Sequence, residues 1–142
     1  MTGERLPDDV KPVMGNGLPA TMVTCSGDGV PNVTVISQVY YVDDAHVALS
    51  FQFFSKTIQN VRENPRAFVC LHDLVGHTNW VLDLEFQRSE TEGPIFEVMD
   101  MQIEAIASAT GMSGIFKLRA ADIYRVLSVA RKPYPAWVAE SR

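Results

Sequence analysis

Three residues suited to phosphate binding stand together at positions 55–57, where Ser55, Lys56 and Thr57 follow a strand-like segment. Residues 49–52 alternate apolar and polar side chains, which is typical of a half-buried strand. Ser55 suits the N-cap of a helix that Asn64-Pro65 would end. A helix N-terminus has free backbone N–H groups and a partial positive charge, so it binds anions. The pattern predicts a phosphate site, and a capped surface helix with a solvated lysine is the alternative.

Other residue types that carry chemistry are scattered along the chain. The sequence has no GxSxG and no HExxH motif, and His46, His72 and His77 do not have the spacing of a metal site. We therefore predict no metal. Asp83 and Glu85 fall on one face of a strand-like run, where they could act as an acid–base pair. Alternation on a solvated face also explains these two carboxylates, and we predict no catalytic side chain.

The composition indicates one globular domain over residues 1–142. Apolar residues make up 46% of the chain and charged residues 20%, which is enough apolar material for a core. The net charge of −5, without a basic run, argues against a nucleic-acid binder. No apolar run reaches membrane-spanning length and no signal-peptide pattern is present, so we predict a cytoplasmic protein. Cys25 and Cys70 are predicted to be free, buried thiols.

The sequence predicts six strands, at residues 20–26, 32–42, 46–51, 66–72, 79–89 and 121–129. Tight turns join the first three strands into an antiparallel meander. A short helix follows the third strand at residues 55–64. A longer helix occupies residues 94–110, with Pro94 at its first position and Gly111 as its stop. One turn of helix is also expected in the lead-in segment before residue 18.

Residues 79–89 have the clearest strand pattern, with apolar side chains at every second position, namely Trp80, Leu82, Leu84 and Phe86. One face of this strand is therefore buried, and the other is wet or meets a polar partner. Six antiparallel strands of these lengths would curl and close, because closure removes the sheet edges. The predicted fold is mainly β (α+β), a six-stranded antiparallel barrel with one short and one longer helix.

Residues 19–73 resemble the pyridoxamine 5′-phosphate oxidase-like family of FMN-binding split β-barrels. The matching pieces are the turn DG-x-P-N, the strand V-x-x-I-S, the hairpin DD-x-H-V and the helix start F-x-K-T-x-x-N-x-x-x-NP. Each piece alone is weak, but their order and spacing together are specific. The resemblance implies a split barrel and a homodimer, with FMN in a groove at the subunit interface.

The cofactor-binding residues that the resemblance implies are Val35, Ile36, Ser37, Ser50, Phe51, Ser55, Lys56, Thr57 and Asn79. Lys56 and Thr57 would hold the phosphate with help from Ser55. The two strands before the short helix would line the isoalloxazine ring and the ribityl chain. The amide of Asn79 would reach the flavin, either within the same chain or from the partner subunit. A strand rich in Val and Ile suits this role, because a flavin ring needs apolar walls and a few backbone donors.

The arginine-rich substrate set of true pyridoxamine 5′-phosphate oxidases has no counterpart here. The second strand has Val, Ile and Ser at these positions, and the tail RKPYPAWVAESR differs from the family's C-terminal signature. We therefore expect an FMN-dependent oxidoreductase that acts on another small molecule. A non-enzymatic flavin-binding or sensing module and a deazaflavin-dependent reductase remain alternatives. The polar face of residues 79–89 and the proline-rich tail are predicted dimer contacts.

Overall fold

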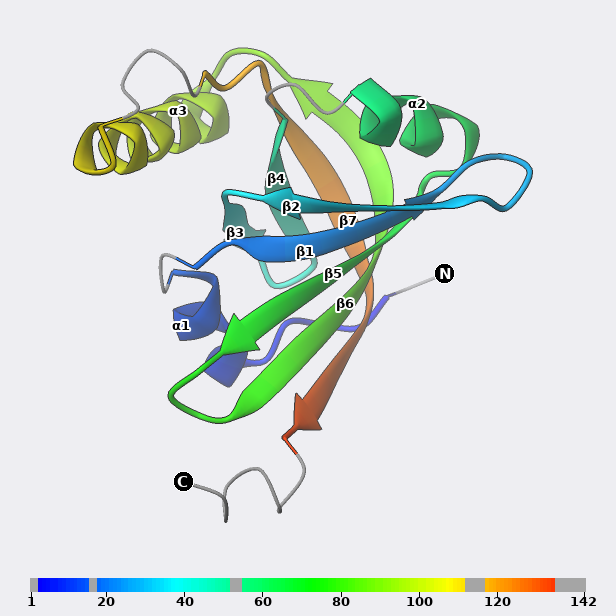
Figure 1. The fold of residues 1–142 in the computed structure, drawn as a ribbon, viewed down its shortest axis with the longest axis horizontal. Coiled ribbons are helices and arrows are strands. Elements are labelled where there is room, and N and C mark those ends of the chain that lie inside the picture. Colours follow the sequence, from blue (N-terminus) through cyan, green and yellow to red (C-terminus); the bar gives the residue numbers. More distant parts are fainter. Residues whose placement is uncertain (1–2, 16–17, 52–54, 112–116, 135–142) are drawn as a thin grey trace.

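The computed structural model describes residues 3–15, 18–51, 55–111 and 117–134, in which every strand belongs to one antiparallel sheet. The strands of this part of the chain are β1 (Ala20–Cys25), β2 (Pro31–Ile36), β3 (Val39–Asp43), β4 (His46–Phe51), β5 (Arg66–Asp73), β6 (Thr78–Glu90) and β7 (Ala120–Pro133). Their order across the sheet is β2-β1-β5-β6-β7-β4-β3. The sheet is strongly curved, so that β2 crosses in front of the long strands β6 and β7 (Figure 1).

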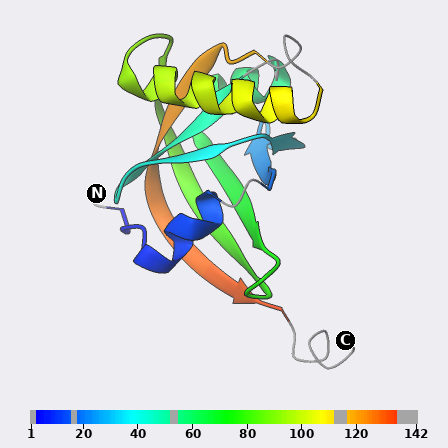
Figure 2. The same cartoon turned by 90° about the vertical axis from the view of Figure 1, so that its left-hand side faces the viewer.

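The described helices are η1 (Asp8–Val10), α1 (Lys11–Met14), α2 (Ser55–Glu63) and α3 (Pro94–Ala109). Helices α2 and α3 lie at the same end of the sheet, whereas α1 lies beside its lower half (Figures 1 and 2). Pro94 occupies the first turn of α3, and Gly111 with φ 73° follows its end. Within the described residues, no helix has the length and apolar character needed to cross a bilayer.

The prediction of a closed, six-stranded barrel is wrong, because the segment 32–42 is two strands instead of one. The chain leaves β2 after Ile36 and begins β3 at Val39. Strand β2 pairs with β1 and β3 pairs with β4, at opposite edges of the sheet. The described residues form no β2–β3 ladder, and the sheet stays open. Both antiparallel pairings of the predicted meander are present, β1 with β2 and β3 with β4, but the break divides them into two separate hairpins. Strand-forming residues stand on both sides of Ser37 and Gln38, and neither of these two is a Gly or Pro that would signal a turn, so propensity did not reveal the break.

Several local predictions are confirmed by the structure. Strand β4 has the predicted bounds, and β1 and β2 form the predicted hairpin. The apolar side chains of β6 alternate into the core, and Trp80 is buried there. Both cysteines are free thiols, but Cys25 and Cys70 are only half-buried, which corrects the prediction of full burial. Their strands cover a core on one face only, and the two thiols are on the other face.

Two apolar cores hold the fold together. The first fills the concave side of the sheet and includes Val10 and Val13 from the first two helices. The second lies between α3 and the strands β3, β4 and β7. Strand β4 serves both cores, because Val47 and Leu49 face the first while Ala48 faces the second. This sharing explains why the four inner residues of β4, 47–50, are all buried.

A substitution in the first core tests its contribution to stability. Leu82 is fully buried on β6, between Val69 of β5 and Val129 of β7. Leu82→Ala removes buried methyl groups and leaves a cavity, so we expect the free energy of unfolding to fall by about 3 kcal/mol. Urea denaturation followed by circular dichroism measures this. Val75→Ala is the control, because Val75 is 94% exposed; a loss there as large as in Leu82→Ala would contradict the assignment of the core.

Candidate functional site

The first turn of α2 carries the residues predicted to bind phosphate. Lys56 is exposed, and Thr57 is buried against the sheet. The Thr57 Oγ1 atom accepts a hydrogen bond from Asn32 Nδ2 at 3.3 Å, which ties the start of the helix to the start of β2. Ser55 is the first residue of α2, and its side chain lies outside the described part of the structure. The structure thus brings an exposed cation and a fixed hydroxyl together at a helix N-terminus.

A second polar contact fixes the same helix one turn later. Asn60 is fully buried, and its Nδ2 atom donates to Thr24 Oγ1 of β1 at 3.1 Å. Thr57 and Asn60 are three residues apart, so both project from the buried face of α2. Buried polar groups are costly unless they pair. These two contacts therefore set the position of α2 on the β1–β2 hairpin.

The β1–β2 turn brings a carboxylate close to Lys56. Gly27 N–H donates to Glu63 Oε2 at 2.9 Å, which links the turn to the end of α2. The Ser26 hydroxyl donates to Asp28 and holds the pKa of that carboxyl below its usual value. The positive charge of Lys56 acts in the same direction. Asp28 is thus a negatively charged neighbour of Lys56, and the exposed Lys56 side chain leaves room for a further anion.

The residues predicted to line the cofactor occupy the end of β2 and the end of β4. Val35 is exposed, whereas the side chain of Ile36 is in the core and leaves only its backbone for a ligand. Ser37 directly follows β2, and the backbone carbonyl of the next residue, Gln38, accepts a hydrogen bond from Ser50 N–H at 3.4 Å. Ser50 Oγ is buried and has no hydrogen-bond partner within the described residues. The crossing after β2 therefore brings Ser37 close to Ser50 and Phe51.

Asn79 lies away from the start of α2 in the same chain, although His72 and Thr21 connect it to the strand position that pairs with Val35 of β2. Its Oδ1 atom is 3.1 Å from His72 Nδ1, and His72 Nε2 is 3.3 Å from Thr21 Oγ1. These residues are at the β5–β6 hairpin end, which Figure 1 shows far from α2. Six residue steps along β5 separate Arg66 from His72, a span of roughly 20 Å. One chain alone does not join Asn79 to the start of α2.

Sequence reasoning missed the polar residues that fix α2, namely Thr24, Asn32 and Asn60. The sequence of α2 contains a signal for these contacts. Thr57 and Asn60 lie on the same buried helix face as Val61, where apolar residues would be expected. Polar residues on the buried face of a short helix indicate hydrogen bonds to the sheet beneath it. The identity of the partners required the three-dimensional structure.

Fold and site together define a curved-sheet protein of the split-barrel type with a candidate anion site at a helix start. The chain belongs to the pyridoxamine 5′-phosphate oxidase family, because the family model with the description "Pyridoxamine 5'-phosphate oxidase" matches residues 6–127. This match covers most of the chain and confirms the resemblance found in the sequence. No functionally curated protein matches the sequence.

Solved structures with the same fold include proteins of different described roles. An FMN-binding protein from Syntrophomonas wolfei has a TM-score of 0.70 at 15% identity, covering 86% of this chain and 82% of its own. An F420 reductase has a TM-score of 0.65 at 11% identity, with 88% and 98% covered. The haem storage protein HutZ from Vibrio cholerae has a TM-score of 0.60 at 14% identity, with 93% and 98% covered. At these identities the likeness shows the fold alone.

A buried carboxyl lies on β7, opposite Leu49 of β4. Asp122 accepts a hydrogen bond from the Ser89 hydroxyl at 2.6 Å. Burial raises the pKa of Asp122 above its usual value, although the Ser89 hydrogen bond and the charge of Arg62 act against this rise. A carboxyl whose pKa is higher in the folded state stabilises the fold fully below its unfolded pKa. This contribution is lost as the pH rises through the folded pKa.

We expect Asp122→Asn to raise the free energy of unfolding at pH 7 by about 1 kcal/mol, because the amide avoids burying a charge and still accepts from Ser89. The gain should shrink as the pH falls toward 4. Urea denaturation at several pH values between 4 and 8 measures it. Asp100→Asn, on the exposed face of α3, is the control and should leave the profile unchanged. A variant no more stable than the parent at pH 7 would count against this account.

Proposed function

We propose that the protein binds FMN and acts, as a homodimer, as an FMN-dependent oxidoreductase on a small molecule other than pyridoxine or pyridoxamine 5′-phosphate. One observation carries the proposal. The exposed Lys56 stands beside a helix start that the Asn32–Thr57 contact holds against β2. A preformed site of this kind suits a phosphate, because the backbone donors and the cation are already in place.

The phosphate end of the cofactor would meet three kinds of donor. The Lys56 ammonium supplies charge, and the free N–H groups of the first turn supply hydrogen bonds. Because Thr57 Oγ1 accepts from Asn32, the hydroxyl proton of Thr57 remains available to donate to a phosphate oxygen. Ser55 would add to this set as the first residue of α2. The neighbouring carboxylate of Asp28 would weaken the attraction between Lys56 and the phosphate, because it partly neutralises the positive charge of Lys56.

Strand β2 would run along the length of the cofactor. Asn32 to Ser37 is five residue steps, which is roughly 17 Å and comparable with an extended FMN molecule. A phosphate at Thr57 would thus place the ring near Ser37, where Ser50 and Phe51 also end their strand. The buried Ser50 Oγ, which lacks a partner among the described residues, suits a hydrogen bond to such a ligand. Val35 would offer an apolar side chain and Ile36 its backbone.

Bound flavin supplies hydride and single-electron transfer, which no side chain here provides. The protein's own part would be to bind the phosphate, position the ring and exclude water. Membership of the pyridoxamine 5′-phosphate oxidase family and the fold shared with an FMN-binding protein support this cofactor. The fold shared with an F420 reductase keeps a deazaflavin as the second candidate. The second strand lacks the arginines expected for a vitamin phosphate substrate.

The homodimer would form through an apolar row on the convex face of the sheet. Val33 of β2 pairs with Val23 of β1, which pairs in turn with Phe68 of β5. Val33 is 66% exposed and Phe68 is 44% exposed. In the next row, Val35 is 59% exposed. Neighbouring exposed apolar side chains on an edge of a sheet indicate an interaction surface, and a two-fold contact between copies would bury them.

A dimer would also give Asn79 its predicted role. Within one chain, Asn79 lies at the opposite end of β5 and β6 from α2. Asn79 is on the same convex face as the apolar row, next to His72. An antiparallel two-fold arrangement would bring this end of one copy toward the helix start of the other. The proline-rich tail beyond residue 134, which was predicted to join this contact, lies outside the described residues.

Removing the Lys56 charge tests the phosphate site. We expect Lys56→Ala to weaken FMN binding by about 1–3 kcal/mol, because it removes one charged hydrogen bond. Quenching of flavin fluorescence on titration with the purified protein measures the dissociation constant. Arg62→Ala is the matched control, since Arg62 is a cation in the last turn of the same helix. Equal affinities of Lys56→Ala and the parent would refute the proposed phosphate site.

The same titration separates the cofactor candidates. Tighter binding of FMN than of the deazaflavin F420 supports the proposal, and the reverse order favours the deazaflavin alternative. Stopped-flow mixing of the reduced protein with oxygen and acceptors then tests activity. Reoxidation no faster than that of free FMN, with every acceptor, would favour a binding or sensing module over an enzyme.

A charge on the apolar row tests the dimer. We expect Val33→Glu to shift the protein from dimer to monomer at micromolar concentration, because a carboxylate would be buried without a partner. Analytical ultracentrifugation measures the association. Met101→Glu is the control, because Met101 is exposed on α3, which covers β3, β4 and β7 and not the apolar row. A monomeric parent protein would contradict the dimer itself.

A further inference from the structure

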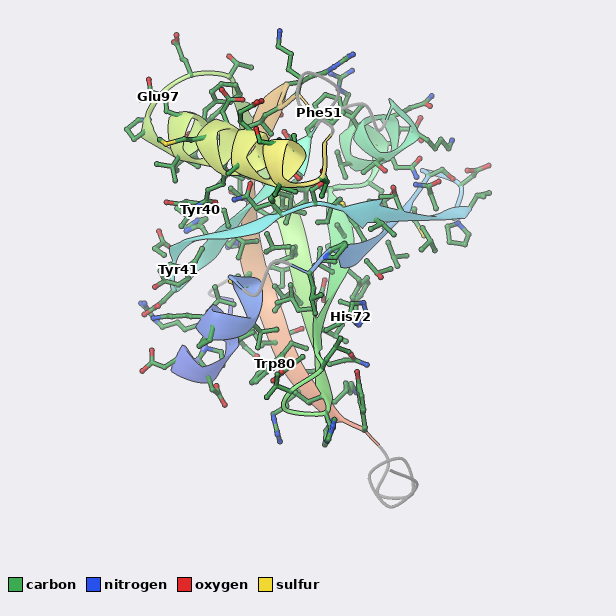
Figure 3. The ribbon with its side chains drawn as sticks, turned by 60° about the vertical axis from the view of Figure 1, so that its left-hand side comes forward. Tyr40, Tyr41, Phe51, His72, Trp80 and Glu97 are labelled. Atoms are coloured by element: carbon green, nitrogen blue, oxygen red, sulfur yellow. The ribbon has the colours of Figure 1, made fainter. Side chains whose placement is uncertain are left out.

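A groove separates α1 from α3 on the side of the molecule where the chain crosses from β2 to β3. Its main part is a cavity of about 290 Å³, with Met14 and Leu18 on one wall, Ile106 on the other and Ser37 with Gln38 at its base. A second cavity of about 210 Å³ adjoins it, shares Gln38, and continues along β3. Together they have the size of a site for a small molecule. In Figure 3, Tyr40 lies toward α3 and Tyr41 toward α1.

The groove exists because the two helices belong to different cores. Val10 and Val13 anchor the α1 region in the first core, whereas Met99 and Ile103 anchor α3 in the second. The crossing at Gln38 passes between these cores. Neither helix packs its flank against the other, so the space above the crossing is left open. It is a consequence of the fold, which two well-packed cores hold in shape.

Two glutamine amides meet across this groove. Gln38 Nε2 donates to Gln102 Oε1 of α3. Gln38 Oε1 is buried and has no hydrogen-bond partner within the described residues. The amide nitrogen of Gln102 carries two N–H donors. The linked pair therefore presents the Gln38 Oε1 acceptor close to the amide donors of Gln102. A buried acceptor without a partner costs free energy, and a ligand that donates to it would recover that free energy.

The charges around the groove exclude an anionic ligand. Among the described lining residues of both cavities, Lys11 is the one charged side chain. Its Nζ atom is 3.1 Å from Asp8 Oδ1 and 3.3 Å from Asp44 Oδ1, and it lies 4.7 Å from the centre of the Tyr41 ring. The carboxylates of Asp8 and Asp44 already neutralise the positive charge of Lys11. A phosphate or carboxylate group would find no uncompensated cation here.

We propose that this groove binds a small, uncharged ring compound whose edge carries a lactam, that is, a ring N–H beside a carbonyl group. The N–H would donate to Gln38 Oε1, the carbonyl would accept from the Gln102 amide, and the ring would lie between Met14 and Ile106. Pyrimidinediones have this edge. The proposal goes beyond cofactor binding and does not depend on it. Because Ser37 lines the groove and also belongs to the proposed flavin site, a ligand here would lie beside a bound flavin.

Three related ring compounds test the proposal on the full-length protein without added flavin. Titration of ¹⁵N-labelled protein with uracil should shift the side-chain amide signals of Gln38 and Gln102. The probe 1,3-dimethyluracil lacks the ring N–H, and orotate adds a carboxylate to the same ring. Dimethyluracil should bind about tenfold more weakly than uracil, the factor that one lost hydrogen bond corresponds to. Orotate should also bind more weakly, because its carboxylate would find no uncompensated cation, and binding of orotate as tight as that of uracil would count against the proposal. Equal binding of dimethyluracil, or no shift with uracil, would overturn the proposal.

Variants of the two helices complete the test. Gln102→Leu should weaken uracil binding about tenfold and keep the fold, because Gln102 is exposed on α3. Gln59→Leu is the matched control, an exposed glutamine on α2 outside the groove, and should bind as the parent does. Repeating the titration with FMN present separates the two sites. Unchanged uracil binding supports a distinct groove, and displacement of uracil by FMN would overturn it.

Discussion

The crossing of the chain at Ser37–Gln38 is the constraint on which the rest of the structure depends. Strand β2 takes β1 as its partner, and β3 takes β4, so the short link between them must pass from one edge of the sheet to the other. A link so short forces the sheet to curve until its edges approach. The curvature produces a concave core, leaves the convex side of β3, β4 and β7 to α3, and opens the groove at the link.

The position of α2 follows from a different kind of interaction. Its inner face is not mainly apolar, because Thr57 and Asn60 replace two of the residues that would otherwise pack on the sheet. Hydrogen bonds are directional, so these contacts fix the rotation and height of the helix more narrowly than apolar packing would. A phosphate site needs such accuracy, since donors misplaced by an ångström lose most of their value.

The sequence predicts the helices and strands correctly where the hydrophobic periodicity is strong. It does not predict where a strand ends when that end is set by pairing with other strands. The alternation from Trp80 to Phe86 and the start of α3 at Pro94 were read correctly, because local chemistry specifies them. The break after Ile36 was not predicted, because Ser37 and Gln38 carry no Gly or Pro turn signal and strand-forming residues stand on both sides of them. For the site, the motif predicted Lys56 and Thr57, but the contacts of Asn32 and Thr24 depend on segments far apart in sequence. Whether these residues bind FMN stays a prediction.

Cofactor binding and dimerisation would be coupled through β2. This strand is an edge of the open sheet; its length matches the proposed path of the flavin, and Val33 and Val35 leave its outer face apolar and exposed. A second copy that covers this face would bury apolar area and remove water from the same strand. A ligand that binds only the dimer stabilises it by mass action. A closed barrel would lack this open edge. The edge is therefore the feature through which cofactor binding would promote dimerisation, and dimerisation would promote cofactor binding.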